Sequence, residues 1–218
     1  MSRRFLFAAL CASLASTLSS CGLVTSTNRS VFTVFDVSGT YVEAVPDAAK
    51  FAKLMISELQ PGDWVGVSQI SACSFSEKEI VLQRQLPETP SMATTAKREL
   101  FAQIDNYASQ VKSAKYTDIR GAIAQAAFEL RQRPEPEKFI VLFSDMVEDH
   151  GKGCDTSAAK LDLKGIHVIA ANVIKSNPAD PDKYIALLEK WETTITESGG
   201  TWSLVGSPDQ LPELVAAR

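Results

Sequence analysis

Two hydrophobic patterns alternate along the chain from residue 31 onward. Val31 to Phe35 is a continuous β-rich run, which predicts a strand that is buried on both faces. In the following segment apolar residues recur at i, i+3, i+4 and i+7, which predicts an amphipathic helix that ends before Pro61-Gly62. The apolar positions of this helix are Ala48, Phe51, Ala52, Met55, Ile56 and Leu59.

The same two patterns recur to the end of the chain. Further strands are expected at residues 64–70, 80–82, 139–143, 166–174 and 201–205, and further helices at 93–110, 119–130, 158–163, 180–195 and 211–217. Charged residues flank the strand at 80–82, as is typical of a strand at a sheet edge. Strands that alternate with helices, and that are apolar throughout, predict an α/β fold with an open, mostly parallel sheet covered on both faces.

The first twenty residues have the pattern of an export signal. Arg3 and Arg4 precede a short apolar stretch, Phe5 to Leu14, that is too short to cross a membrane as a helix. Leu18-Ser19-Ser20-Cys21-Gly22 follows and resembles the bacterial lipobox, in which cleavage leaves a lipidated cysteine at the new N-terminus. The alternative is an ordinary secretory signal in which Cys21 has no role.

The lipobox interpretation divides the chain into three parts. Residues 1–20 form a lipoprotein signal peptide, residues 21–30 a lipidated Cys21 with a short polar linker, and residues 31–218 one domain. We therefore expect a lipid-anchored, extracytoplasmic protein of the bacterial cell envelope. Gly22 after the cysteine resembles the outer-membrane sorting pattern of bacteria with two membranes.

The charge balance argues against a nucleic-acid partner. Arg3 and Arg4 are two of the 22 basic residues, so the mature chain retains 20 basic and 26 acidic residues and a net charge of −6. No basic stripe or basic-aromatic cluster is present in the sequence.

Small oxygen-bearing side chains gather in three separate segments. These are Asp36-Val37-Ser38-Gly39-Thr40, Thr117-Asp118 and Ser144-Asp145. Taken singly, they are typical of a turn after a strand, a helix N-cap and a strand end. Asp36 and Asp145 each follow a buried strand, however, and in parallel sheets ligands bind beyond the carboxyl ends of the strands.

Together, the three segments predict a site for a hard divalent cation. Carboxylate and hydroxyl oxygens are the ligands that Mg²⁺, Mn²⁺ and Ca²⁺ prefer. The candidate ligands are Asp36, Ser38, Thr40, Thr117 and Asp145. Two carboxylates balance the charge of the ion, and one coordination position is left for an acidic residue of a protein partner.

These segments resemble the motifs of the von Willebrand factor type A domain, the family that includes integrin I domains. Val34 to Thr40 is similar to the first motif of the metal-ion-dependent adhesion site, Tyr116 to Ile119 to its threonine motif, and Val141 to Asp145 to its aspartate motif. The resemblance covers nearly all of residues 31–218. It implies a Rossmann-like, doubly wound sheet of six strands with one short antiparallel edge strand, and capture of a protein ligand through the metal rather than catalysis.

The sequence departs from the family pattern at two positions. Thr40 stands where the first motif usually has a second serine, and Met146 stands where a glycine usually follows the aspartate motif. Neither change removes a ligand oxygen. The loop after Asp145 is expected to differ in shape.

Two other functions fit parts of the sequence. A phosphatase resembling the haloacid dehalogenase superfamily would use Asp36 as nucleophile and Asp145 with Asp149 as metal ligands, but Ser38 occupies the position of the aspartate that serves as its general acid and base. The other alternative is a structural envelope lipoprotein that binds a partner without metal. Asp149, His150 and Cys154 are close in sequence but match no common zinc spacing, which favours a polar loop at the rim of the main site.

A disulfide between Cys73 and Cys154 is also expected. They are the only cysteines left once Cys11 is cleaved off and Cys21 is lipidated, and an exported domain meets oxidising conditions. The alternative is two separately buried thiols. If the strands that precede these cysteines flank the first strand, the two loops must lean together over it for the sulfur atoms to bond.

Overall fold

The computed structural model describes residues 27–151, 160–171, 180–207 and 210–216. The predicted signal peptide, Cys21 and Cys154 lie outside the described residues. The strands are β1 (Arg29–Asp36), β2 (Trp64–Ile70), β3 (Ile80–Gln85), β4 (Glu137–Phe143), β5 (Ile166–Ala171) and β6 (Thr201–Val205). The α-helices are α1 (Val45–Glu58), α2 (Pro90–Gln110), α3 (Ile119–Arg131), α4 (Pro181–Glu197) and α5 (Leu211–Ala216), and short 3-10 turns cover Val42–Ala44 and Glu77–Glu79.

The six strands form one sheet in the order β3-β2-β1-β4-β5-β6. All neighbouring pairs are parallel except β2 and β3, which pair antiparallel at one edge. This arrangement confirms the predicted Rossmann-like α/β fold. The order reverses between β1 and β4, the two central strands, so the switch point at which such sheets bind ligands lies between them.

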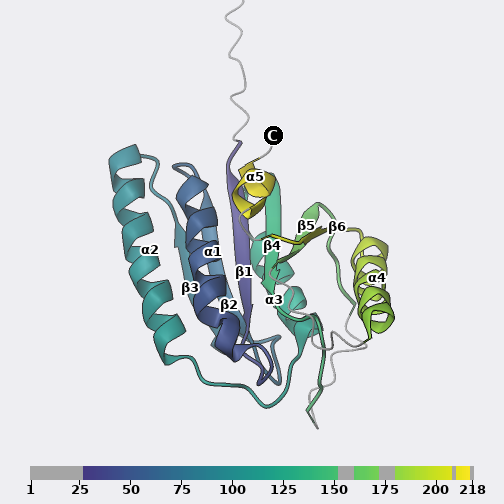
Figure 1. Ribbon diagram of the computed structural model, residues 1–218. Helices are drawn as coiled ribbons and strands as arrows, with labels where there is room; N and C mark the ends of the chain where they lie inside the picture. Colours follow the sequence, from purple (N-terminus) through teal and green to yellow (C-terminus); the bar gives the residue numbers. More distant parts are fainter. Residues whose placement is uncertain (1–26, 152–159, 172–179, 208–209, 217–218) are drawn as a thin grey trace, which may run out of the picture.

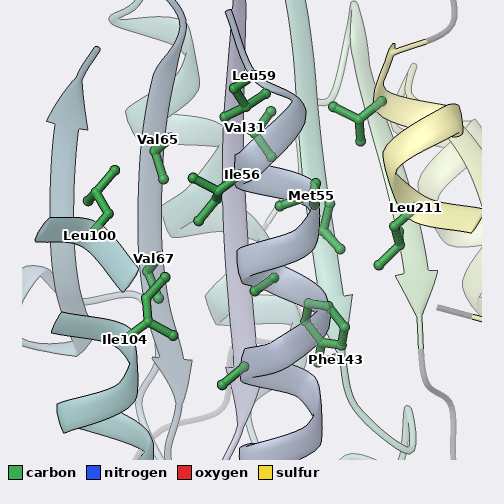
Figure 2. Packing of buried hydrophobic residues seen from close by; sticks show 14 of the residues in the cluster. Val31, Met55, Ile56, Leu59, Val65, Val67, Leu100, Ile104, Phe143 and Leu211 are labelled. Atoms are coloured by element: carbon green, nitrogen blue, oxygen red, sulfur yellow. The ribbon is translucent and has the colours of Figure 1, made fainter. Parts of the chain in front are cut away.

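Helices cover both faces of the sheet (Figure 1). Val31 and Phe35 of β1 belong to the core layer that contains residues of α1, α2 and α5, whereas Phe32 and Val34 belong to the layer that contains residues of α3 and α4. Because successive side chains of a strand point to opposite faces, a strand covered on both sides must be apolar throughout. Figure 2 shows the first of these two layers, in which Met55 and Ile56 of α1 pack over the sheet.

One predicted element differs from the structure. Residues 160–163 form no helix, because Leu161 and Leu163 are both buried while Asp162 between them is exposed, which is the alternation of an extended segment. The Leu163 N–H donates to the carbonyl of Ser198 rather than within a helical turn. The strand expected at 166–174 is present as β5 over Ile166–Ala171, and its predicted residues 172–174 lie outside the described part of the chain.

A polar network closes the end of the sheet where β1, β2 and β4 begin. The buried Asp63 accepts hydrogen bonds from the backbone N–H groups of Arg29 (2.9 Å) and Gln60 (2.7 Å). The side chain of Arg29 forms an ion pair with Glu137 at 2.7 Å. Glu135 accepts a hydrogen bond from the Ser30 hydroxyl at 2.8 Å. Each of these acidic groups therefore has a donor or a cation as partner.

Among the described residues, no helix has the length and apolar character needed to cross a membrane.

Candidate metal centre

The two predicted carboxylate ligands lie side by side at the switch point. Asp36 is the last residue of β1, and Asp145 follows β4 by two residues. The two strands are direct neighbours, with Phe35 paired to Phe143, so both chains leave the sheet at the same edge. The side chain of Asp36 is fully buried, and Asp145 is only 3% exposed.

Asp36 is held by donors from the segments that follow β1 and β4. The Ser144 hydroxyl donates to one of its carboxylate oxygens at 2.6 Å, and the Ser38 backbone N–H donates to the other at 2.8 Å. The Ser144 hydroxyl also accepts a hydrogen bond from the backbone N–H of Met146 at 2.9 Å. The sequence pointed to the Ser144-Asp145 segment but did not predict that Ser144 positions Asp36.

A second chain of hydrogen bonds reaches Asp145. The hydroxyls of Ser38 and Thr40 lie 3.1 Å apart, and the Thr40 hydroxyl donates to a carboxylate oxygen of Asp145 at 2.9 Å. The other oxygen of Asp145 accepts from the Val147 backbone N–H at 3.0 Å. Four of the five predicted ligands, Asp36, Ser38, Thr40 and Asp145, therefore lie in two linked segments of one site.

The backbone of Thr117 pairs with the loop that follows Asp145. Its N–H donates to the carbonyl of Asp149 at 2.7 Å, and its carbonyl accepts from the Asp149 N–H at 3.0 Å. This pairing joins the segment before α3 to the loop that follows Asp145. In the described part of the chain, no hydrogen bond links the Thr117 side chain to the other four residues.

The electrostatics of the site favour a bound cation. Burial raises the pKa of Asp36 above its usual value, hydrogen bonds from Ser144 and Ser38 oppose this rise, and the nearby Asp145 adds to it. Among the described residues, neither Asp36 nor Asp145 forms an ion pair with a basic side chain. Two neighbouring buried carboxylates without a counter-charge, surrounded by hydroxyl oxygens, are a donor set that fits Mg²⁺ or Mn²⁺.

The loop after Asp145 has a backbone conformation that normally suits glycine. Met146 has φ +64°, and it is the one non-glycine residue at positive φ in the described ranges. Its side chain is fully buried under α3 and α4, and its carbonyl accepts a hydrogen bond from the Trp191 indole N–H at 2.9 Å. Met146 therefore adopts a left-handed backbone conformation that is held by core packing and by the hydrogen bond from α4.

Tyr184 of α4 belongs to the electrostatic surroundings of the same site. Burial raises its pKa, and the Asp145 carboxylate contributes to the rise.

Cys73 is disulfide-bonded. The other three cysteines of the chain all lie outside the described residues, so the pairing with Cys154 stays a prediction. The strands that precede the two cysteines, β2 and β4, do flank β1 as the proposed bridge requires.

No family model matches the sequence, and a search of curated proteins also finds no match. Solved structures do resemble the chain. A von Willebrand factor type A protein from Catenulispora acidiphila superposes with a TM-score of 0.53 at 14% identity, covering 87% of this chain and 41% of that one. The pilus adhesin SpaC from Lactobacillus rhamnosus GG, in its open conformation, gives 0.57 at 9% identity, covering 88% and 29%.

The PilB minor pilin from Streptococcus sanguinis gives a TM-score of 0.57 at 13% identity, covering 87% of this chain and 60% of that one. The chain thus spans less than two thirds of the length of each of these three proteins. Identities this low establish the fold alone. The chain has a von Willebrand factor type A-like fold.

Proposed function

We propose that this protein is an envelope-anchored binding module that captures a protein partner through a divalent cation, Mg²⁺ or Mn²⁺. The observation that carries the proposal is the linked set of Asp36, Ser38, Thr40 and Asp145 at the switch point of the sheet, in which two buried carboxylates have no basic partner among the described residues. Thr117 completes the proposed ligand set from the adjoining loop. An acidic side chain of the partner would occupy a remaining coordination position.

The structural neighbours support a binding role rather than catalysis. One of them is a pilus adhesin and another a minor pilin. The proposed module would use the same fold. The phosphatase alternative needs a second carboxyl as general acid and base, and the corresponding Ser38 instead donates its backbone N–H to Asp36 and places its hydroxyl beside Thr40.

A lipid anchor on Cys21 would determine which end of the domain lies near the membrane. The proposed lipid on Cys21 is followed by residues 22–28 before β1 begins, a segment that spans at most about 25 Å when fully extended. β1 starts at the end of the sheet opposite to Asp36 (Figure 1). A short anchor would therefore hold that opposite end near the membrane and present the metal centre to the surrounding compartment.

A capture experiment tests the partner. The chain from residue 22 onward, which contains every described element, is immobilised and exposed to envelope extract with Mg²⁺ or with a chelator. Asp36→Asn removes a proposed ligand, and Asp63→Asn is the matched control, since it changes a buried aspartate at the other end of the sheet. In Mg²⁺, we expect the wild type and Asp63→Asn to retain a protein from the extract. The same protein should not be retained when chelator replaces Mg²⁺, or by Asp36→Asn.

The alternatives predict other outcomes. Retention that survives both the chelator and Asp36→Asn would support the metal-independent lipoprotein. Hydrolysis of a generic phosphate ester, abolished by Asp36→Asn, would support the phosphatase.

Mass spectrometry of the mature N-terminus tests the anchor. A diacylglyceryl adduct on Cys21 is expected, and an unmodified N-terminus elsewhere in residues 22–30 would exclude it.

A further inference from the structure

A second group of metal-ligating side chains lies beside the candidate centre. Asp118, Glu148 and His150 each place one potential ligand atom so that all three atoms lie within 4.8 Å of one another. Asp118 comes from the start of α3, whereas Glu148 and His150 come from the loop after β4. None of the three belongs to the ligand set proposed above.

Backbone N–H groups fix both carboxylates of this group. One oxygen of Asp118 accepts from the Gly121 N–H at 2.8 Å and the other from the Ser74 N–H at 2.9 Å. One oxygen of Glu148 accepts from the Arg120 N–H at 2.9 Å, and the other faces His150. A carboxylate oxygen has two lone pairs, so accepting one backbone N–H does not prevent it from also binding an ion.

His150 lacks the hydrogen bonds that would explain its position. Its Nδ1 is buried and has no partner among the described residues. Its Nε2 lies 3.6 Å from the facing oxygen of Glu148, which is longer than a hydrogen bond. The separation is instead close to the roughly 3.4 Å expected between two ligands of one tetrahedral zinc ion, given metal–ligand bonds of about 2.0–2.1 Å.

We propose that Asp118, Glu148 and His150 bind a divalent transition-metal ion of the zinc class. An imidazole combined with carboxylates suits Zn²⁺, whereas the oxygen-only set around Asp36 suits Mg²⁺ or Mn²⁺. Two carboxylates and a neutral imidazole balance the charge of the ion, and water fills the open position. The comparison of Asp149, His150 and Cys154 with common zinc spacings did not reveal this set. Its third member, Asp118, lies about thirty residues earlier in the sequence.

The second ion would brace the first centre. Thr117 precedes Asp118, and its backbone pairs with Asp149, which stands between Glu148 and His150. An ion held by Asp118, Glu148 and His150 therefore joins the two segments on either side of this pairing. It would fix Thr117, a proposed ligand of the first ion, without contacting that ion.

The test is a Zn²⁺ titration of the chain from residue 22 onward, with its disulfide intact and in excess Mg²⁺ so that the first centre is occupied. The chain has two histidines, His150 and His167, so the ring signals in NMR spectra can be assigned by one substitution each. We expect one equivalent of Zn²⁺ to shift the His150 signals and leave those of His167 unchanged. His167 is a suitable internal control because its Nε2 is already 2.8 Å from the Ser203 hydroxyl.

Variants make the assignment specific. His150→Gln and Glu148→Gln should each weaken Zn²⁺ binding at least about tenfold, the lower end of the loss seen when even an indirect metal partner is removed. The Glu148→Gln side chain still has an oxygen that can accept the hydrogen bond from the Arg120 N–H, so we expect this variant to fold as the wild type does. His167→Gln should bind Zn²⁺ as the wild type does.

Equal Zn²⁺ affinity in the wild type and His150→Gln would overturn the proposal. So would Zn²⁺ binding that is lost in Asp36→Asn but not in Glu148→Gln, since the ion would then occupy the first centre. The first centre is assessed separately by Mg²⁺ titration, so failure of one site is distinguishable from failure of the other.

Discussion

The two ends of the sheet bury acidic groups in different ways. Where the strands begin, Asp63 accepts two backbone N–H groups and lies near the positive charges of Arg29 and Lys97. Where β1 and β4 end, Asp36 and Asp145 face each other among hydroxyls, and no basic side chain in the described part of the chain pairs with them. Burial raises the pKa of both Asp36 and Asp63, so burial alone does not distinguish the two ends.

The two ends differ in what satisfies their buried acidic groups. The network around Asp63 is satisfied by the protein itself and serves to join β1 to the turn before β2. The group around Asp36 has acceptor oxygens and negative charge in excess, which a cation would satisfy. We infer that the first end is structural and the second is a binding site, and the following predictions test that contrast.

The largest expected effect is stabilisation by metal. At a Mg²⁺ concentration about one hundred times the dissociation constant, the free energy of unfolding of the wild type should rise by about 2.7 kcal/mol. Asp36→Asn should show no such rise, while Asp63→Asn should show the full rise above its own baseline. Urea unfolding with Mg²⁺ or chelator measures this, and an equal rise in both variants would contradict the contrast.

The next effect concerns stability without metal. Asp63→Asn should lower the free energy of unfolding by about 1–3 kcal/mol, because an amide nitrogen then faces a backbone N–H that can only donate. Asp36→Asn should cost less than about 1 kcal/mol, since its Oδ1 still accepts from the Ser38 N–H and the Ser144 hydroxyl can rotate to accept from the new amide. Denaturant unfolding in chelator compares them, and the reverse order would place the structural end at Asp36.

The pH dependence should separate the two aspartates once metal is present. A carboxyl whose pKa is raised on folding contributes most stability below its unfolded value, 3.8 for Asp36, and loses that contribution as the pH rises through the folded-state pKa. In chelator, the stability of the wild type relative to Asp36→Asn should therefore fall as the pH rises through this window.

Excess Mg²⁺ should reverse that trend for Asp36, because the ion binds the charged carboxylate. The trend for Asp63, measured against Asp63→Asn, should stay the same with and without metal. Unfolding curves at a series of pH values, each recorded with Mg²⁺ and with chelator, provide the comparison. A reversal at Asp63 as well would show that the metal acts on the whole domain.

The smallest effect is expected at Thr40. Thr40→Ser keeps the hydroxyl that donates to Asp145, so Mg²⁺ affinity should change less than about threefold, which is under 1 kcal/mol. Thr40→Ala removes that hydroxyl and should weaken binding more than Thr40→Ser does. Calorimetry on both variants tests this, and identical affinities would remove Thr40 from the ligand set.

The sequence predicted the sheet, and the position of Asp36 and Asp145 at the same edge of it, because both depend on local pattern. Continuous apolar runs locate β1 and β4, and Asp36 and Asp145 follow from where those runs end. The helix predicted at 158–163 was wrong because Leu161 and Leu163 are buried as alternate residues of an extended segment. The backbone of that segment bonds to Ser198, which is distant in sequence. The left-handed backbone at Met146 also depends on tertiary packing, since the Trp191 indole binds its carbonyl.

The proximity of Asp118 to Glu148 and His150 could likewise not be predicted from the local sequence pattern. Taken alone, Thr117-Asp118 is typical of a helix N-cap followed by an acidic residue in the first turn. In the structure Asp118 itself is the N-cap, and its carboxylate accepts from the Gly121 N–H. The pairing of Thr117 with Asp149 and the hydrogen bond from the Arg120 N–H to Glu148 bring the distant loop beside it.

Calorimetric titration with Mn²⁺ tests the central claim most directly. The chain from residue 22 onward, its Asp36→Asn variant and its Asp63→Asn variant are titrated with Mn²⁺ in parallel, all three in the His150→Gln background so that only the first centre is measured. Our account predicts one bound ion for the parent and for Asp63→Asn, with similar affinities, and no measurable binding for Asp36→Asn. Binding that persists in Asp36→Asn, or traces without binding from all three proteins, would contradict it.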